Sequence, residues 1–428
     1  MEKLIALPIK GEAFLLIRDG KTVLVDGGYN SHDLSRALKV HVPGLKKIDI
    51  VICTHADRDH AGGLTTLIDA SGLTVGEFWL PGTWVDSIPE LIKSPQSTMK
   101  GLLSELDRPL QGWFRDFPAD ADAVAHHFEK VATAERREAN SQRQDYDFKE
   151  GEVPFPYSSL KNDLELEIER YWYETLNFEA DYRNQRRYRK QLSRTDRAFE
   201  SGRSQIRYRK SKGRVSPAVA NYWLELIDAA QAIRAIAAQA IGYGVPIRWF
   251  DYNAFATSRS ARGGNGQFLE PLNSVEQPPP PPRKLSYLAK LSPANEQCLA
   301  FLAPADATRL GVMFCGDSPL GDGPSYANSF LTKKIQPQSL SFVATAPHHG
   351  SENNQPAYTH ISGWARPLLW VRSGGSVKQP GATYKAIDPV NRACTHCPQK
   401  GLKLREAVVH LERSTLLFRM SSHECVCR

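Results

Sequence analysis

The segment Ile48-Asp49-Ile50-Val51-Ile52-Cys53-Thr54 runs directly into His55-Ala56-Asp57-Arg58-Asp59-His60. The first seven residues are rich in β-branched side chains, which is typical of a buried strand. The six that follow contain two His and two Asp. Imidazole and carboxylate groups are ligands for borderline and hard divalent metals. The sequence therefore predicts a metal site where this strand ends, although a solvated turn of the same composition is the alternative.

Two further apolar runs also end in polar residues. Residues 311–315 lead to Gly316-Asp317, and residues 342–346 lead through Pro347 to His348-His349. α/β folds place ligand sites at the edge of a sheet where strands end. We therefore expect the three clusters to meet at one metal centre, which disfavours the solvated turn.

The motif His55-x-Asp57-x-Asp59-His60 resembles the HxHxDH signature of the metallo-β-lactamase superfamily, with Asp57 in place of the second His. Asp26-Gly27-Gly28 before the motif, and Gly-Asp and His-His-Gly-Ser after it, make the chain most similar to the hydrolase domain of ComEC-type DNA-uptake proteins. Asn295-x-x-Cys298-Leu299 also resembles a strand entry in that family, with Cys in place of Ser. The resemblance covers residues 1–82 and 245–375. It implies an α/β fold, the αββα metallo-β-lactamase sandwich.

The resemblance also implies two metal sites and a set of residues for them. The ligands would be His55 and Asp57 at the first site, Asp59 and His60 at the second, Asp317 bridging both, and one of His348 and His349. Spacing does not choose between the two histidines of the pair, although we slightly favour His348. Asp26 would orient a ligand histidine. In such a site a metal-activated water attacks the substrate, with Asp59, His60 and Asp317 as the catalytic residues.

One ligand of the family has no clear match. The additional histidine after the third motif corresponds only to the pair His126-His127, which we expect on a surface helix. We therefore expect the first metal site to be poorly held or empty and the second to be the surer one. Asp57 in place of His makes the site harder, so Mn²⁺ or Mg²⁺ competes with Zn²⁺.

The sequence divides into segments of different character. We predict a first half of the metallo-β-lactamase core over residues 1–84, a large helical insertion over 85–244, the second half of the core over 245–390, and a Cys-containing C-terminal tail over 391–428. Within the insertion, Ser216-Pro217 predicts a helix start, and Gly242 and Gly244 predict its end. Residues 258–283 are predicted to form a loop.

Positive charge is concentrated in the insertion. The chain has 428 residues and a net charge of +7, but residues 183–214 contain 13 Lys and Arg against two acids, a local net charge of +11. The basic residues that we expect to contact a phosphate backbone are Arg186, Arg187, Arg189, Lys190, Arg207, Arg209 and Lys210, interleaved with tyrosines that can stack on bases. A solvated helix face, pairing with the acidic residues 163–169, or a protein partner are the alternatives.

Seven cysteines are an odd number for a disulfide framework. Cys53, Cys298 and Cys315 lie in apolar runs and are predicted to be buried thiols. Cys394-x-x-Cys397 and Cys425-x-Cys427 form two close pairs that could hold a structural zinc ion. Free thiols or disulfides are the alternatives for these four.

Composition limits the class of protein. The mean hydropathy of −0.41 is that of an ordinary soluble protein. The sequence contains no run of about 18 apolar residues, so we expect no membrane span. The first residues lack the pattern of a signal peptide. We expect a cytoplasmic protein without a membrane partner. The leading hypothesis is a phosphodiesterase or nuclease acting on DNA. The others are a hydrolase of cyclic nucleotides or another small phosphoester, and a partner-regulated metal-binding subunit of a bacterial defence system.

Overall fold

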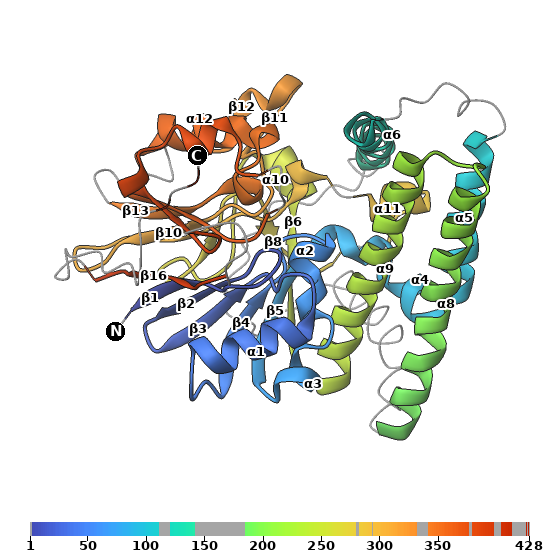
Figure 1. Cartoon of the computed structure of the whole chain (residues 1–428), viewed down its shortest axis with the longest axis horizontal. Helices are drawn as coiled ribbons and strands as arrows, with labels where there is room; N and C mark the ends of the chain where they lie inside the picture. Colours follow the sequence, from blue (N-terminus) through green and yellow to red (C-terminus); the bar gives the residue numbers. More distant parts are fainter. Residues whose placement is uncertain are drawn as a thin grey trace, which may run out of the picture. The chain divides into compact units, whose positions relative to one another are not determined.

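The computed structural model describes residues 2–110, 120–141, 185–279, 282–292, 294–331, 341–375, 379–397, 404–412, 425 and 427. The chain divides into two compact units (Figure 1). The first consists of Met1–Gly82, Val245–Gln277 and Pro293–Arg428, and the second of Thr83–Gly244 and Pro278–Ser292. The helices of the predicted insertion therefore lie in a unit separate from the predicted metal ligands.

The first unit is built on two mixed β-sheets. The larger sheet has the spatial order β16 (Ala407–His410), β1 (Lys3–Ala6), β2 (Phe14–Arg18), β3 (Lys21–Val25), β4 (Lys47–Ile52), β5 (Thr74–Pro81), β6 (Ile247–Asp251) and β8 (Val275–Glu276). The smaller has the order β15 (Arg392–Cys394), β14 (Leu369–Arg372), β13 (Phe342–Thr345), β10 (Gly311–Phe314), β9 (Phe301–Ala303) and β7 (Glu270–Pro271). A short pair, β11 (Gly321–Asp322) and β12 (Asn328–Ser329), stands apart.

Alternation of apolar side chains explains why the two sheets pack together. Val312 and Phe314 of β10 join one core with Phe14 and Trp79 of the larger sheet, whereas Met313 points to the opposite face and packs in a second core. Successive side chains of a strand point to opposite faces, so β10 contributes to both cores. Trp79 also contacts Phe301 of β9 at a ring-centroid distance of 5.5 Å.

Helices cover the outer faces of both sheets (Figure 1). The helices of this unit are α1 (Ser31–His41), α2 (Arg58–Ala61), α3 (Leu67–Ser71), α10 (Tyr252–Ser258), α12 (Gln355–Trp364) and α13 (Ala382–Lys385). Ile361 of α12 packs with Met313 and Trp370 on the outer face of the smaller sheet. The first unit is therefore a layered arrangement of helix, sheet, sheet and helix.

Parallel pairing brings the polar clusters to one edge. β3 to β6 are parallel in the larger sheet, and β10, β13, β14 and β15 are parallel in the smaller one. Their carboxyl ends meet at the same edge. Asp26 follows β3, the His55 cluster follows β4, Asp317 follows β10 and His348 follows β13. The edge predicted to hold the metal is therefore the edge at which these strands end.

The second unit is helical. Its helices are α4 (Ile88–Lys93), α5 (Pro95–Leu110), α6 (Ala121–Ser141), α8 (Gln185–Ser211), α9 (Pro217–Tyr243) and α11 (Tyr287–Leu291). Ser216 caps α9 by accepting a hydrogen bond from Val219 N at 3.2 Å. The helix continues through Gly242 and ends at Gly244, so the prediction that Gly242 also stops it is wrong. Gly244 has a φ of +65°, which ends the helix and favours glycine.

The units depart from the predicted boundaries at residues 278–292, which we had assigned to the core. Arg283 forms a buried ion pair with Asp86, and its backbone N donates to the same carboxylate at 2.7 Å. The Glu105 carboxylate accepts hydrogen bonds from the backbone N of Tyr287 and Leu288, at 2.9 and 3.0 Å. These ionic and capping contacts tie the segment to the helices, although it is distant from them in sequence.

The segment predicted to be a loop and the predicted Cys-containing tail both contain strands. Residues 258–283 include β7 and β8, which extend the two sheets, and the predicted tail 391–428 supplies β15 and β16. Val409 of β16 is buried in the core between the sheets. Short edge strands of two to four residues carry too little periodicity to be recognised in sequence. Among the described residues, no helix is long and apolar enough to cross a membrane.

Candidate metal centre

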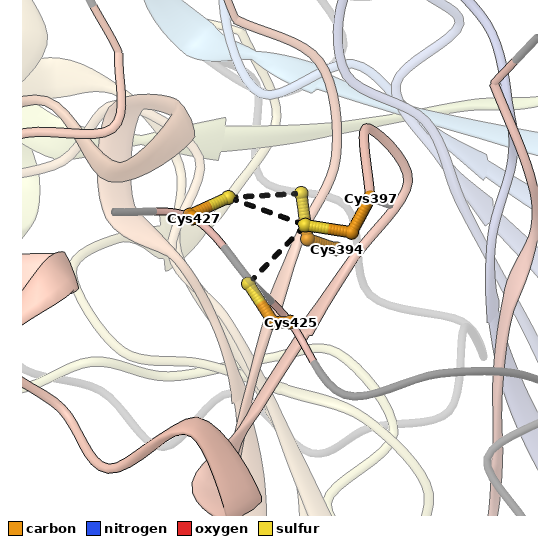
Figure 2. Close-up of side chains that lie close together, drawn as sticks. All are labelled: Cys394, Cys397, Cys425 and Cys427. Atoms are coloured by element: carbon orange, nitrogen blue, oxygen red, sulfur yellow. Dashed lines mark hydrogen bonds between the residues drawn. The ribbon is translucent and has the colours of Figure 1, made fainter. Parts of the chain in front are cut away.

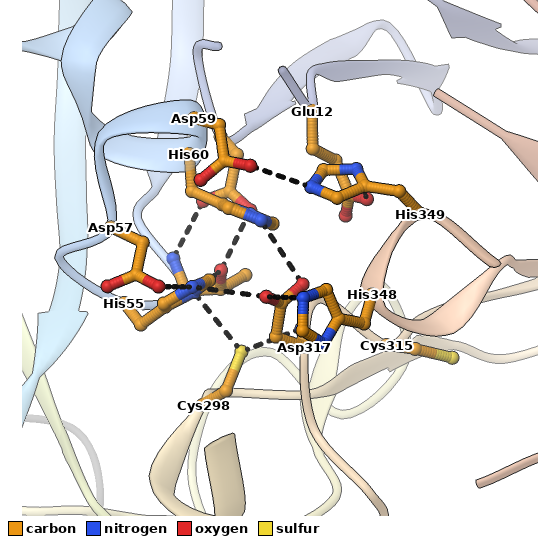
Figure 3. Close-up of polar contacts among 12 residues, drawn as sticks. Glu12, His55, Asp57, Asp59, His60, Cys298, Cys315, Asp317, His348 and His349 are labelled. Carbon is orange, nitrogen blue, oxygen red and sulfur yellow. Dashed lines mark hydrogen bonds and ion pairs between the residues drawn. The ribbon is translucent and has the colours of Figure 1, made fainter. Parts of the chain in front are cut away.

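Asp317 lies between two groups of histidines and carboxylates (Figure 3). Its Oδ1 is 3.2 Å from His60 Nε2, and its Oδ2 is 3.6 Å from His55 Nε2 and 3.4 Å from His348 Nε2. His55, His60 and Asp317 are buried. Each oxygen of this one carboxylate therefore faces a different group, the arrangement that a bridging ligand requires.

The histidine pair divides between these two groups. His349 Nε2 lies 3.0 Å from Asp59 Oδ2, and its ring centroid is 5.0 Å from that of His60. His348 instead faces Asp317 Oδ2 on the side of His55, whose Nε2 is 3.5 Å from Asp57 Oδ2. The sequence led us to expect one ligand from this pair, with a slight preference for His348. The structure brings both side chains to the centre.

The backbone explains how adjacent histidines point to different places. His348 and His349 both adopt left-handed conformations, with φ of 48° and 53°. Non-glycine residues rarely adopt this conformation, and it costs about 1–3 kcal/mol where it occurs. His349 is held by its Nδ1, which lies 3.0 Å from the backbone oxygen of Ser373. Strain at two successive residues is typical of positions whose side chains serve a function.

Asp26 holds His60 in a defined orientation. Its carboxylate accepts hydrogen bonds from Thr54 N at 2.8 Å and Thr54 Oγ1 at 2.7 Å, and Asp26 Oδ2 lies 2.8 Å from His60 Nδ1. A carboxylate that accepts a hydrogen bond from Nδ1–H keeps the proton on Nδ1 and leaves Nε2 with a lone pair for a metal. This geometry is the one expected of a carboxylate that orients a ligand histidine.

We predict that Asp26→Asn lowers the metal affinity of the centre by about 10–100-fold. The amide would present an N–H to Nδ1 of His60, which favours the tautomer that carries its proton on Nε2. Metal titration followed by competition with a chelator measures the change. Asp49→Asn is the control, because Asp49 also accepts a backbone N–H in the larger sheet, from Thr22 at 2.9 Å, at a position away from the centre. Equal affinities of the two variants would contradict the orienting role.

Charges in the centre depend on one another. Burial raises the pKa of Asp317, but the facing histidines, His348 and His60 foremost, outweigh burial and hold that pKa well below its usual value. Burial lowers the pKa of His60, but the Asp317 and Asp26 carboxylates outweigh it and raise that pKa well above its usual value. The carboxylates therefore require positive charge beside them, from histidine protons or from a cation.

The donor atoms fit a divalent cation. His55 Nε2, His60 Nε2 and Asp317 Oδ1 are buried and have no hydrogen-bond partner among the described residues, whereas buried polar atoms are normally paired. The ligand atoms of His55, His60 and Asp317 lie within 4.8 Å of one another, and so do those of Asp59, His60 and His349. Unpaired imidazole nitrogens beside carboxylates are the donor set of a metal site.

Sequence analysis overlooked Glu12 and the location of Cys298. Glu12 is buried, its Oε2 lies 3.4 Å from His349 Nδ1, and burial raises its pKa to about 7. An acid inside the apolar stretch before β2 was the signal available for it. Cys298 is a buried free thiol, as predicted, but its Sγ lies 3.4 Å from His55 Nδ1 and accepts from Asp317 N at 3.1 Å. It therefore helps to hold two of the candidate ligands.

The predicted histidine pair and the predicted basic residues lie in the second unit. His126 and His127 are part of α6, and the seven basic residues are part of α8. The side chains of Arg186, Arg187, Arg189 and Lys190, and the acidic residues 163–169, lie outside the described residues. Arg207 is exposed, Arg209 is half-buried, and Lys210 donates to Asn221 Oδ1 at 3.0 Å.

The layered α/β unit and its histidine–carboxylate cluster define a class of protein that binds a divalent metal at the edge of two sheets. The model of the metallo-beta-lactamase superfamily matches residues 8–85, which include Asp26 and the cluster from His55 to His60. This match and the mixed α/β fold support assignment to that superfamily, whose members are mostly metal-dependent hydrolases. No curated protein matches the chain.

Proposed function

We propose that this protein is a metal-dependent phosphodiesterase that cleaves nucleic acid, with DNA as its substrate. The observation that carries the hydrolase part is the position of Asp317, whose Oδ1 faces His60 and whose Oδ2 faces His55 and His348. A pair of metals in such a site can stabilise both the attacking and the leaving oxygen at phosphorus.

The residues of the centre have distinct roles in this proposal. His55, Asp57 and His348 would hold the first metal, Asp59, His60 and His349 would hold the second, and Asp317 would be shared by both. Bound divalent metal supplies an activated water and neutralises charge on the phosphate oxygens. Asp26 keeps Nε2 of His60 free of its proton, and Asp59 orients the attacking water. Three aspartates in the donor set favour Mn²⁺ or Mg²⁺ alongside Zn²⁺.

The described end of α8 supports a polyanionic substrate. Ala198, Phe199 and Ile206 are buried on one face of this helix, and Arg207 is exposed. Lys212, in the turn that follows the end of α8 at Ser211, is exposed as well. Tyr208 between them is 54% exposed, and Lys212 Nζ lies 5.8 Å from the centre of its ring. Cations interleaved with an exposed aromatic ring suit a nucleic-acid backbone with bases stacked beside it.

The test is degradation of linear double-stranded and single-stranded DNA in the presence of Mn²⁺. We expect cleavage by the wild type, none by Asp59→Ala, and weaker DNA binding by the double variant Arg207→Ala, Lys212→Ala. For duplex DNA, each lost phosphate contact should reduce the slope of log affinity against log salt by about 0.9. Lys39→Ala with Lys385→Ala is the matched control, since both lysines are exposed in the first unit. Absence of metal-dependent cleavage of DNA and of RNA would refute the proposal.

Burial of the centre favours a second candidate, a hydrolase of cyclic nucleotides or another small phosphoester. His60 and His349 are buried, and solvent reaches the described ligands mainly at Asp57, Asp59 and His348. In that case the double variant Arg207→Ala, Lys212→Ala would hydrolyse the synthetic diester bis(p-nitrophenyl) phosphate at the wild-type rate. DNA would not be cleaved. Less than one metal per chain together with no hydrolysis would instead favour a partner-regulated binding subunit.

A further inference from the structure

Four cysteines from two distant segments meet in the first unit (Figure 2). Cys397 Sγ lies 3.7 Å from Cys425 Sγ and 3.4 Å from Cys427 Sγ, and Cys427 Sγ lies 3.8 Å from Cys394 Sγ. All four sulfurs lie within 4.8 Å of one another, and all four cysteines are free thiols. We call this group the cysteine cluster.

Each pair of the cysteine cluster has its own local support. Cys394 is the last residue of β15, and the chain turns after it so that His396 N donates to Cys394 Sγ at 3.2 Å. This turn brings Cys397 back beside Cys394. Cys425 is 0% exposed and packs in the core that also contains Met313, so its thiol is not free in solvent.

The sulfur separations match those of a tetrahedral metal site. Four thiolates at about 2.3 Å from a Zn²⁺ ion lie about 3.8 Å from one another. The separations of 3.4, 3.7 and 3.8 Å given above are close to that value. Thiols are weak hydrogen-bond donors, so four of them gain little by converging without a metal.

Two buried arginines provide an independent indication of negative charge at the cysteine cluster. Arg372 is 1% exposed and donates from Nη1 to Cys394 Sγ at 3.2 Å, and Arg392 is 3% exposed and donates to the backbone oxygen of Cys427 at 3.2 Å. Neither forms an ion pair with any carboxylate among the described residues. A buried charge without a counter-charge is costly. Four neutral thiols supply no counter-charge, whereas four thiolates around Zn²⁺ leave two negative charges beside the two arginines.

We propose that Cys394, Cys397, Cys425 and Cys427 bind one structural Zn²⁺ ion that connects Cys425 and Cys427 to β15. The four protein ligands fill the coordination sphere, as in closed structural sites that have no position for a substrate. This site is separate from the histidine–carboxylate centre in its ligands, its geometry and its preference for a softer metal.

The zinc also supports the proposed catalytic centre indirectly, through Arg372. Arg372 donates from Nε to the backbone oxygen of His349 at 2.7 Å while its Nη1 contacts Cys394. One guanidinium group therefore connects the cysteine cluster to the strained histidine pair. Loss of the zinc would leave Arg372 without its counter-charge and loosen its hold on His349.

The test begins with the intact wild-type protein, purified under reducing conditions. Titration of thiols with an organomercurial should release about one Zn²⁺ per chain, in step with the reaction of four thiols. Exchange with Co²⁺ should produce thiolate-to-cobalt charge-transfer absorption, which ligation by histidine and aspartate does not produce. Absence of that absorption, rapid alkylation of all four thiols in the native protein, or a mass that shows disulfide bonds would each overturn the proposal.

Variants then locate the ion. Cys427→Ser should lose the absorption and one zinc, whereas Cys427→His should keep a zinc because histidine is also a ligand. Cys315→Ala is the matched control, since Cys315 is a buried free thiol outside the cysteine cluster. If Cys427→Ser and Cys315→Ala bind the same amount of zinc, the proposal is wrong. If Cys427→Ser does not fold, the measurements on the wild type still decide.

Discussion

Replacing Asp317 with asparagine is expected to remove bound metal and to lower the rate of hydrolysis by more than about a hundredfold. Loss of a residue that only orients a metal ligand already lowers metal affinity or activity by about 10–100-fold. Asp317 is the carboxylate that faces both groups of the centre, with His60 on one oxygen and His55 and His348 on the other. An amide has one oxygen and no charge, so it cannot serve both groups. Bound metal per chain and turnover of bis(p-nitrophenyl) phosphate measure the effect.

The control for this prediction is Asp69→Asn, the same chemical change on an exposed acid of α3 in the same unit. It should keep both metal and turnover. Thermal unfolding of the metal-free proteins separates a folding defect from a binding defect. Full metal content in Asp317→Asn would show that the carboxylate does not bridge, and would leave the two groups as independent sites.

Replacing Gly63 with alanine is expected to destabilise the first unit by about 3 kcal/mol or more, at the upper end of the cost of overpacking. A Cβ atom on Gly63 would lie 1.9 Å from the backbone oxygen of Gly27, closer than any real contact. The two loops are also joined by hydrogen bonds, from Gly63 N to Gly28 O and from Gly27 N to His60 O, both 2.7 Å. Any shift that relieves the clash must therefore move Asp26 or His60.

Thermal unfolding measures this loss, and Gly363→Ala is its control. Gly363 lies in α12, where a Cβ would meet nothing within 4 Å, so alanine should be neutral or slightly stabilising there. A melting temperature of Gly63→Ala equal to that of Gly363→Ala would show that the two loops are not in close contact. Metal affinity should fall in parallel with stability in Gly63→Ala, because the clash lies beside the centre.

Long strands with strong periodicity could be predicted from sequence, and short ones could not. Residues 48–54 were predicted as a strand because they are rich in β-branched side chains and precede a polar cluster, and the structure has β4 at Lys47–Ile52. β7 and β8 have two residues each, and β16 lies in what we took for a tail. Such edge strands are stabilised by pairing with distant strands, which leaves no local pattern in their own residues.

The candidate site shows the same division. The residue order was enough to predict which side chains come together. Residues that directly follow the ends of parallel strands lie at the same edge of a sheet. The residues predicted in this way are His55, Asp57, Asp59, His60 and Asp317. The residue order could not tell which of His348 and His349 would be a ligand, because both follow the same strand. Their left-handed backbone, held by contacts with Asp317, Asp59 and Ser373, sends them to different groups.

The stretch from Ile48 to Gly63, together with Asp26, Gly316-Asp317 and His348-His349, thus predicted the fold class and the metal ligands from sequence. Folding was needed to bring Glu12 and Cys298 to the centre, and to set two buried arginines against four cysteines. The reason is physical. A motif within one segment depends on local geometry, which neighbouring residues encode, whereas burial and charge pairing depend on segments that meet only once both sheets have packed.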